Sequence, residues 1–401
     1  MKEIIIKNIG PIKEIKVELN NINVFIGPQS SGKSTIAKII SYCQWVEKRF
    51  LLDGEYNYEF SEQFMEFHRI DKNYFNKDSY FKYESNYVSI SHSGDNNNNP
   101  SINKKREVLN YKKSKNIYIP AERNFVSVIP NLGKFKESND NIMSFLYDWY
   151  DAKKNYLLNN SFPILDLGVT YHYINDNDLD ILTLADNDEI FLKNASSGLQ
   201  SIIPLMMLVD YLTVEFYKKR KSSSVNEEEE IKVLIQKTLD EYIKKERKQK
   251  GFSKENLNYL LKIVGFRSNY HYSNFIIEEP EQNLFPETQR DLIYFLLNRI
   301  NNTNRNHSLT ITTHSPYILY ALNNCILGYQ VKGVLPSDVK NDLLSKNSWI
   351  NPELVSIWEI QSGTIKSIKN KKTGTLSKHY FNKNMNEIMD EYYEMLNFLE
   401  I

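Results

Sequence analysis

Residues 27–34 read Gly-Pro-Gln-Ser-Ser-Gly-Lys-Ser, and they lie between an apolar segment at 23–26 and a segment of helical periodicity at 35–50. This spacing matches G-x-x-x-x-G-K-[ST] between a strand and a helix. Glycines at these positions let backbone N–H groups wrap around phosphates, and the dipole of the following helix favours negative charge. The pattern predicts a phosphate-binding loop made of Gly27, Pro28, Gln29, Ser30, Ser31, Gly32, Lys33, Ser34 and Thr35.

Two residues of this loop have distinct expected roles. Lys33 is expected to reach the β- and γ-phosphates of ATP and to take part in catalysis. The hydroxyl of Ser34 is expected to hold Mg²⁺. A chance glycine-serine turn is the alternative, and the flanking strand and helix argue against it.

Two acidic residues end a second apolar segment, because residues 275–280 read Phe-Ile-Ile-Glu-Glu-Pro. In a doubly wound sheet this strand end lies beside the phosphate-binding loop. Glu278 is then expected to orient Mg²⁺ and its waters, and Glu279 to polarise the attacking water as general base. Paired glutamates at a strand end are otherwise usually solvated, so the hypothesis depends on the upstream loop.

Two further motifs complete the set. His314, in Thr-Thr-His-Ser-Pro at 312–316, ends another short β segment, from which a neutral imidazole could sense the γ-phosphate. Residues 194–200 read Asn-Ala-Ser-Ser-Gly-Leu-Gln before an apolar helix, so Ser196, Ser197 and Gly198 could form an anion site. Taken alone, His314 would be a structural hydrogen bonder, and one of the serines an ordinary helix N-cap.

The composition excludes several classes of protein. The 401 residues carry 50 basic and 50 acidic side chains, so no overall field draws the chain toward nucleic acid or a membrane. Cys43 and Cys325 exclude a disulfide framework and a multi-cysteine zinc site, and they suit a reducing compartment. There is no signal-peptide pattern and no apolar run of about 18 residues. We therefore expect a cytoplasmic protein with no membrane partner.

Strands interleaved with helices predict an α/β fold with a mixed or largely parallel core sheet, an antiparallel β subdomain and helical insertions. The expected divisions are an N-terminal lobe at 1–50, a flexible insertion at 51–115, a β/helical subdomain at 116–200, an apolar helix with a charged helical insertion at 201–273, and a C-terminal lobe at 274–401. A helix at 384–400 is expected to close the domain. Basic residues between 104 and 115 are interpreted as a solvated flank, with a nucleic-acid patch as the alternative.

Taken together, the four motifs resemble those of the ABC-type ATPase superfamily of P-loop NTPases. GPQSSGKST is similar to its Walker A motif, ASSGLQ to its signature, FIIEEPE to its Walker B motif and D-loop, and TTHSP to its H-loop. The resemblance implies that ATP and Mg²⁺ lie between two protomers, with Walker A of one facing Ser196, Ser197 and Gly198 of the other. Glu278 stands where the superfamily usually has aspartate, and Ser197-Gly198-Leu199 replaces the usual double glycine. The signature serine is therefore either Ser196 or Ser197.

More narrowly, IEEPEQNLFP, TTHSPYIL and YIPAERN resemble the overcoming-lysogenization-defect (OLD) group and the ATPase subunits of PARIS-type antiphage systems. In that group YIPAERN, at 118–124, lies where transporters carry their Q-loop. Arg123 thereby becomes a candidate for contacting nucleotide or coupling to an arm, and a surface arginine beside a proline turn is the alternative.

The resemblance implies a homo-oligomeric ATPase that detects a phage-encoded trigger protein and holds a separate effector. OLD proteins carry a Toprim nuclease after the ATPase, but residues after Pro316 contain no Asp-x-Asp pair. Any nuclease that acts with this chain is therefore expected to be a separate protein. Two other classes of ATPase are alternatives. An SMC-like DNA-repair ATPase needs a long coiled coil between the phosphate-binding loop and the signature motif. The motor subunit of a transporter needs the signature sequence LSGGQ and a glutamine in the Q-loop.

Overall fold

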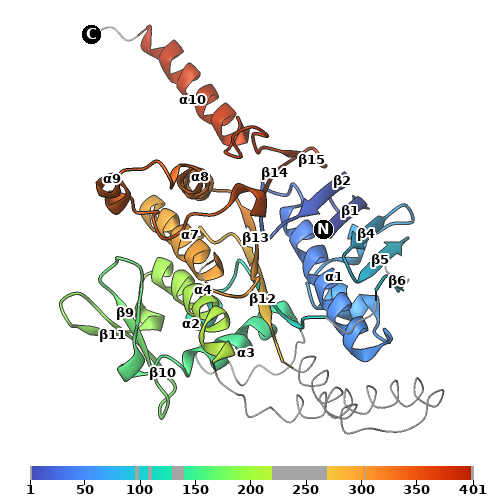
Figure 1. The fold of residues 1–401 in the computed structure, drawn as a ribbon, viewed down its shortest axis with the longest axis horizontal. Helices are drawn as coiled ribbons and strands as arrows, with labels where there is room; N and C mark the ends of the chain where they lie inside the picture. Colours follow the sequence, from blue (N-terminus) through green and yellow to red (C-terminus); the bar gives the residue numbers. More distant parts are fainter. Residues whose placement is uncertain are drawn as a thin grey trace.

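The structure is a computed structural model that describes residues 2–94, 99–106, 111–128, 140–218, 269–301 and 303–398. Figure 1 shows a central sheet with helices on both sides and one helix that projects from the body. Residues 95–98, and residues 219–268 of the segment at 201–273 where a charged helical insertion is expected, lie outside the described residues.

Among the described residues, the central sheet has the order β15-β14-β3-β13-β12-β7. Neighbouring strands are parallel except at the β14–β15 hairpin. The register places Glu278 opposite Thr312, and Thr313 opposite Ile26. The motifs that follow these strands therefore meet at one edge of the sheet, as predicted. The strands are β3 (Ile22–Ile26), β7 (Ser114–Ile119), β12 (Tyr272–Glu278), β13 (Ser308–Thr313), β14 (Val355–Gln361) and β15 (Thr364–Ser367).

Helices cover both faces of this sheet because its strands are apolar on both sides. Phe275 and Ile277 of β12 pack in one core with α3 (Asn141–Lys153), α4 (Ser197–Thr213), α7 (Pro286–Asn301) and α8 (Pro316–Val331). Ile276, which lies between them in sequence, packs in a second core with α1 (Lys33–Asp53). Figure 1 shows α1 on one side of β12 and α4 and α7 on the other. The helices α1 and α4 are thus on opposite faces.

An antiparallel sheet of order β2-β1-β4-β5-β6 packs against α1. Its strands are β1 (Lys2–Ile9), β2 (Ile12–Leu19), β4 (Tyr80–Glu84), β5 (Val88–Ser93) and β6 (Ser101–Lys104). The expectation of a flexible insertion at 51–115 therefore needs correction. Phe81 and Tyr83 alternate with charged residues and are fully buried, but the strands are too short for this alternation to stand out in the sequence.

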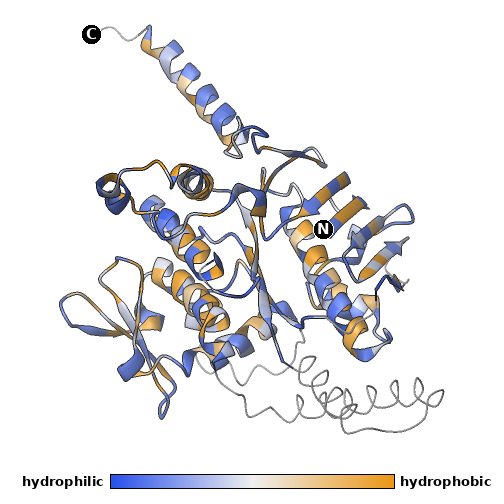
Figure 2. Cartoon of the chain, viewed as in Figure 1, coloured by the Kyte–Doolittle hydropathy of each residue, from blue (hydrophilic) through white to orange (hydrophobic). Residues whose placement is uncertain are grey.

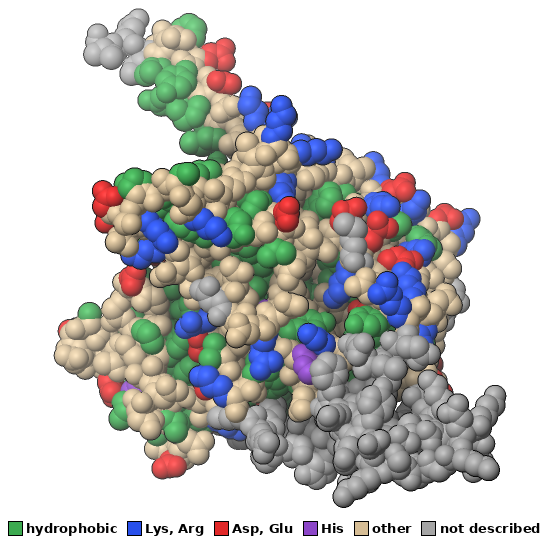
Figure 3. All heavy atoms as spheres, viewed as in Figure 1, with side chains coloured by type: hydrophobic (Ala, Val, Ile, Leu, Met, Phe, Trp, Pro, Cys, Tyr) green, Lys and Arg blue, Asp and Glu red, His purple; other side chains and the backbone are tan. Residues whose placement is uncertain are grey.

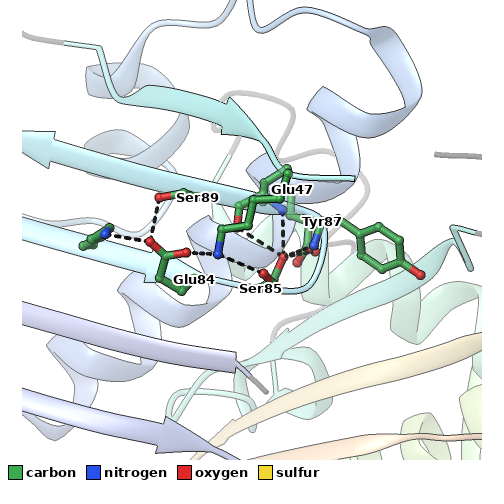
Figure 4. Close-up of polar contacts among 8 residues, drawn as sticks. Glu47, Glu84, Ser85, Tyr87 and Ser89 are labelled. Atoms are coloured by element: carbon green, nitrogen blue, oxygen red, sulfur yellow. Dashed lines mark hydrogen bonds and ion pairs between the residues drawn. The ribbon is translucent and has the colours of Figure 1, made fainter. Parts of the chain in front are cut away.

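A buried carboxylate connects α1 to this second sheet. Glu47 is 5% exposed and accepts hydrogen bonds from the hydroxyls of Tyr83, at 2.9 Å, and Ser85, at 2.7 Å. Figure 4 shows Glu47 meeting Ser85 in the turn between β4 and β5. Burial raises the pKa of Tyr83, so its hydroxyl remains protonated and able to donate. The helix that follows the phosphate-binding loop is thereby fixed at its far end.

Replacing Glu47 with alanine should destabilise the protein by about 2–4 kcal/mol, because two buried hydroxyls lose their acceptor. Glu47→Gln retains one acceptor oxygen and should recover part of that loss. Urea unfolding followed by tryptophan fluorescence measures the change, with the exposed Glu55→Ala as control. A loss below about 0.5 kcal/mol for Glu47→Ala would contradict the role of this carboxylate.

A small antiparallel sheet of order β11-β10-β9-β8 leads into α4 and matches the expected antiparallel subdomain. It contains β8 (Phe162–Pro163), β9 (Thr170–Ile174), β10 (Leu179–Thr183) and β11 (Glu189–Phe191). Within the described residues, Ser197–Tyr217 is long and apolar enough to cross a membrane, but 72% of its apolar window is buried inside the fold. Its hydropathy therefore reflects packing against the sheet and neighbouring helices.

The sequence predicted that the C-terminal helix closes the domain, and the structure shows that it does not. The short helices α2 (Phe125–Val128) and α9 (Ser337–Asp342) follow β7 and α8, and α10 (Tyr380–Leu396) follows the β14–β15 hairpin. No described residue of α10 is buried, and Figure 1 shows it projecting from the body. Figure 2 shows apolar and polar residues alternating along it. This periodicity predicted a helix correctly, but it could not say what the apolar face contacts.

Candidate active site

The loop between β3 and α1 has two positions that only glycine can fill. Gly27 has φ 155°, and a Cβ there would lie 2.4 Å from the carbonyl oxygen of Ile360. Gly32 has φ 100°, and its Cβ would lie 2.8 Å from the side chain of Ile12. Gly32 is also the N-cap of α1, and no side chain within the described ranges caps that end. The first N–H groups of α1 are therefore available to an anion.

Lys33 is folded back over this loop. It is 5% exposed, and its Nζ donates to the carbonyl oxygens of Gly27, at 3.0 Å, and Pro28, at 2.8 Å. The same Nζ lies 3.5 Å from Nδ1 of His314. Burial lowers the pKa of Lys33 to about 8, against the opposing effect of nearby glutamates. The ammonium group is thus still largely charged at neutral pH and provides a cation at the centre of the site.

Four buried polar atoms in the four motif segments have no hydrogen-bond partner among the described residues. They are Oε1 of Glu278, Oε2 of Glu281, Oγ1 of Thr312 and Oγ of Ser31. Glu278 and Thr312 are paired in register and share the face of Ile276, the face that α1 covers. Buried oxygens without partners are costly unless a ligand or water satisfies them.

These oxygens fit a hydrated Mg²⁺, which prefers oxygen ligands and retains several waters. Glu278, 6% exposed, and Ser34, exposed at the start of α1, are the residues that would hold the ion. Within the described ranges, no group of three or more His, Cys, Asp or Glu side chains could hold a metal alone. Phosphate oxygens of a bound ligand, together with waters, would complete the coordination, as is usual for Mg²⁺.

Glu279 and His314 form the solvent-accessible part of the site. Nε2 of His314 lies 3.2 Å from Oε1 of Glu279, and the two side chains are 29% and 33% exposed. This hydrogen bond from His314 lowers the pKa of Glu279, so its carboxylate is ionised at neutral pH. The backbone N–H of His314 donates to Oε1 of Glu281 at 2.5 Å. Glu279 is thus an oriented, charged proton acceptor within reach of water.

The backbone at Glu279 is held in an unfavourable conformation. Its φ of 42° lies in the left-handed region, which costs a residue other than glycine about 1–3 kcal/mol. Its N–H donates to the carbonyl oxygen of Thr312 at 2.9 Å, and its own carbonyl oxygen accepts from Nη2 of Arg123 at 3.0 Å. The surrounding hydrogen bonds therefore impose the turn that carries the carboxylate out of the sheet.

Arg123 is fully buried, and its guanidinium braces this turn. Nη1 donates to the carbonyl oxygen of Glu278 at 3.0 Å, and Nη2 to that of Pro280 at 3.1 Å. Nε donates to the carbonyl oxygen of Ser201 in α4 at 3.2 Å. The sequence left open whether Arg123 contacts nucleotide, couples to an arm or lies on the surface beside a proline turn, and its burial excludes the last of these. These bonds to backbone carbonyls favour coupling, here between the turn after β12 and the start of α4.

The signature-like residues lie at the start of α4, away from the P-loop face of the sheet. Ser196 is the N-cap, with its Oγ accepting from the N–H of Leu199 at 3.4 Å, and Ser197 begins the helix. Both serines are exposed. Because α1 and α4 cover opposite faces, the expected contact between these serines and a nucleotide on the P-loop stays a prediction about a second copy.

No protein-family model matches the sequence, and a comparison with curated proteins finds no match. The chain is similar to the solved SMC head domain from Thermotoga maritima, at 10% identity over 91% of this chain and 97% of that one, with a TM-score of 0.38. It is also similar to the Smc head from Pyrococcus furiosus bound to the C-terminal domain of ScpA, at 10% identity, 98% and 100% coverage and TM-score 0.38. A further similar structure is the ADP conformation of an ATP-binding cassette of an ABC transporter, at 10% identity, 93% coverage of both chains and TM-score 0.33.

The fold is that of a P-loop NTPase. The strand order of the central sheet, the loop between β3 and α1, and the antiparallel sheet beside α1 together define it. These elements bring Lys33, Glu278, Glu279 and His314 to one edge, where the sequence predicted them.

Two residues of this edge were not singled out from the sequence. Glu281 fixes the backbone of His314, and the only signal for it was its place two residues after Glu279. Tyr118 of β7 lies beside Glu278: burial raises the pKa of its hydroxyl, and the Glu278 carboxylate raises it further. A tyrosine inside a strand gives no sequence signal of such a neighbour.

Gly198 connects the start of α4 to the turn after Glu279, because a Cβ at Gly198 would lie 2.9 Å from the carbonyl oxygen of Asn283. Gly198→Ala should therefore displace this turn and slow hydrolysis by roughly tenfold. Gly333→Ala is the matched control, since its Cβ would meet nothing within 4 Å. Steady-state phosphate release measures both variants, and equal rates would contradict the coupling.

Proposed function

We propose that the protein binds ATP with Mg²⁺ at the P-loop and hydrolyses it to ADP and phosphate. The observation that carries this proposal is the chain of contacts from Lys33 through His314 to Glu279, with separations of 3.5 and 3.2 Å. It brings a phosphate-binding cation and an ionised proton acceptor to the same edge of the sheet.

In this function the N-terminus of α1 and Lys33 bind the phosphates and balance their charge. Bound Mg²⁺ supplies further charge neutralisation. Glu279 orients a water toward the γ-phosphorus and accepts its proton as the bond to ADP breaks. His314 holds the Glu279 carboxylate through its Nε2–H group. Arg123 acts as a positioning residue, because it contacts the backbone of the turn.

The complete site is proposed to form between two copies of the chain. Ser196 and Ser197 are exposed at the N-terminus of α4, where backbone N–H groups and hydroxyls suit an anion. In one copy α4 and the P-loop helix lie on opposite faces of the sheet. A second copy would therefore bring Ser196–Gly198 to the ATP held by the first.

Mixing two inactive variants tests this arrangement. Lys33→Ala and Ser196→Ala/Ser197→Ala chains should each be inactive alone, whereas an equal mixture should recover about a quarter of the wild-type rate, because half of the random dimers contain one intact site. A mixture of Lys33→Ala with Glu279→Gln should stay inactive, since both changes affect the same half of the site. Full activity of the serine variant alone would refute the shared site, and retained ATP affinity in Lys33→Ala would refute the P-loop assignment.

We further propose a role in antiphage defence, which rests on the resemblance to OLD-type and PARIS-type ATPases. In this role a homo-oligomer holds a separate effector, such as a nuclease, and releases it when a phage-encoded trigger is detected. The SMC-like alternative predicts that DNA stimulates hydrolysis. A nuclease reading frame beside the gene, copurification of its product and a rate unaffected by DNA would support defence, whereas DNA stimulation without such a partner would support the alternative.

A further inference from the structure

The projecting helix α10 exposes an apolar stripe. Met385, Ile388, Tyr392 and Met395 recur at spacings of three, four and three residues and are 59%, 63%, 52% and 60% exposed. We call these four residues the α10 stripe. Such spacing is that of a coiled-coil seam, and in proteins most of the stability of a helix comes from packing of its apolar face. The stripe therefore requires a partner helix.

The charged side chains of α10 are distributed in the opposite way to that which the helix dipole favours. Its first turn contains no acidic residue and its last turn no basic one. Lys383 lies near the start, while the acidic side chains gather toward the end, at Glu387, Asp390, Glu391 and Glu394. A helix dipole favours the reverse distribution. A partner that brings positive charge to the end of α10 would compensate for this.

A basic hollow lies at the base of α10. It has a volume of about 780 Å³, and Lys366, Lys378 and Lys383 line it together with a single acidic residue, Glu359, and with Tyr320 and asparagines. Lys366 pairs with Glu359 at 3.0 Å and Lys383 with Glu387 of α10 at 3.4 Å, whereas Lys378 forms no salt bridge with any described residue. In Figure 3, hydrophobic side chains cover one side of the projecting helix and basic side chains gather near its base.

We propose that α10 pairs in antiparallel orientation with α10 of a second copy. In that orientation the acidic end of each helix approaches the basic hollow of the other copy, and the two dipoles oppose each other. Crossing near Ile388 places Met385 against Tyr392 of the second copy. A parallel pair would instead bring the acidic ends together. The contact differs from the proposed ATP-dependent one, because it uses neither the P-loop nor α4.

Two neighbouring tyrosines provide a matched test. Tyr392 belongs to the α10 stripe, whereas Tyr393, equally exposed at 55%, points about 100° away from it. In the Lys33→Ala chain without nucleotide, light scattering should give a dimer mass, unchanged by Tyr393→Glu and reduced to monomer by Tyr392→Glu. A monomer before either change, or a dimer after both, would overturn the proposal. The Lys33→Ala background keeps this result separate from the ATP-dependent contact.

Cysteine cross-linking tests the direction of pairing, and the native Cys43 and Cys325 are buried and do not compete. Under mild oxidation Ile388→Cys should cross-link to itself. Met385→Cys and Tyr392→Cys should cross-link only when mixed, because their positions face each other across copies. Efficient self-cross-linking of Met385→Cys alone would show a parallel pair and reject the antiparallel one.

Discussion

The Glu279→Gln variant should hydrolyse ATP about 10³-fold more slowly than the wild-type chain while still binding it, because the amide cannot accept a proton from the attacking water. The amide retains the size and much of the hydrogen bonding of the carboxylate, so the contact with His314 should be largely preserved. Single-turnover hydrolysis and binding of a fluorescent ATP analogue measure the two effects separately.

The control for this experiment is Glu287→Gln, an acidic residue in the first turn of α7. It should leave the rate unchanged. The slow Glu279→Gln variant should also accumulate as an ATP-bound dimer, since the state before hydrolysis persists. Hydrolysis at the wild-type rate would remove Glu279 from the role of base and leave ATP binding untouched.

Replacing Arg123 with lysine should produce the largest combined loss of stability and activity. A lysine has three donors without the planar fork and cannot satisfy all the carbonyls that Arg123 now reaches. We expect a destabilisation of about 3 kcal/mol and a fall in kcat of roughly 100-fold. The KM for ATP should change little, since Arg123 contacts the backbone behind Glu279.

Arg305→Lys is the control, because Arg305 also donates to a backbone carbonyl, that of His271, at 2.9 Å, outside the turn after β12. Rates are compared at a temperature well below both unfolding transitions, so that only folded molecules contribute. A lower stability with normal kcat would assign Arg123 a purely structural role. A raised KM with normal kcat would instead indicate direct contact with nucleotide.

The sequence predicted which residues lie at this edge of the central sheet, because local backbone geometry and strand ends determine their positions. Gly27 and Gly32 are required by backbone geometry, and Glu278 and His314 follow strands that apolar runs reveal. Parallel pairing then brings these strand ends together without any information about side-chain packing.

The sequence could not predict what depends on distant packing. Arg123 looks like a residue of a surface turn, and only the fold shows that carbonyls from β12 and α4 surround it. The aromatic alternation of Phe81 and Tyr83 was too short to distinguish a strand from a loop. The amphipathic pattern of α10 predicted a helix, but a helix pattern is the same whether its partner lies in the same chain or in another.

The position of β3 in the sheet also determines at which stage of chain synthesis the phosphate-binding loop can form. This strand precedes the P-loop, yet its neighbours in the sheet are β13 and β14, and the carbonyl oxygen of Ile360 lies against Gly27. A nascent chain thus cannot assemble the phosphate-binding loop until residues near 360 have left the ribosome. Such long-range pairing is slow to form. Truncated products should therefore lack ATP binding, and the proposed ATP-dependent dimer would form only from chains that have folded almost completely.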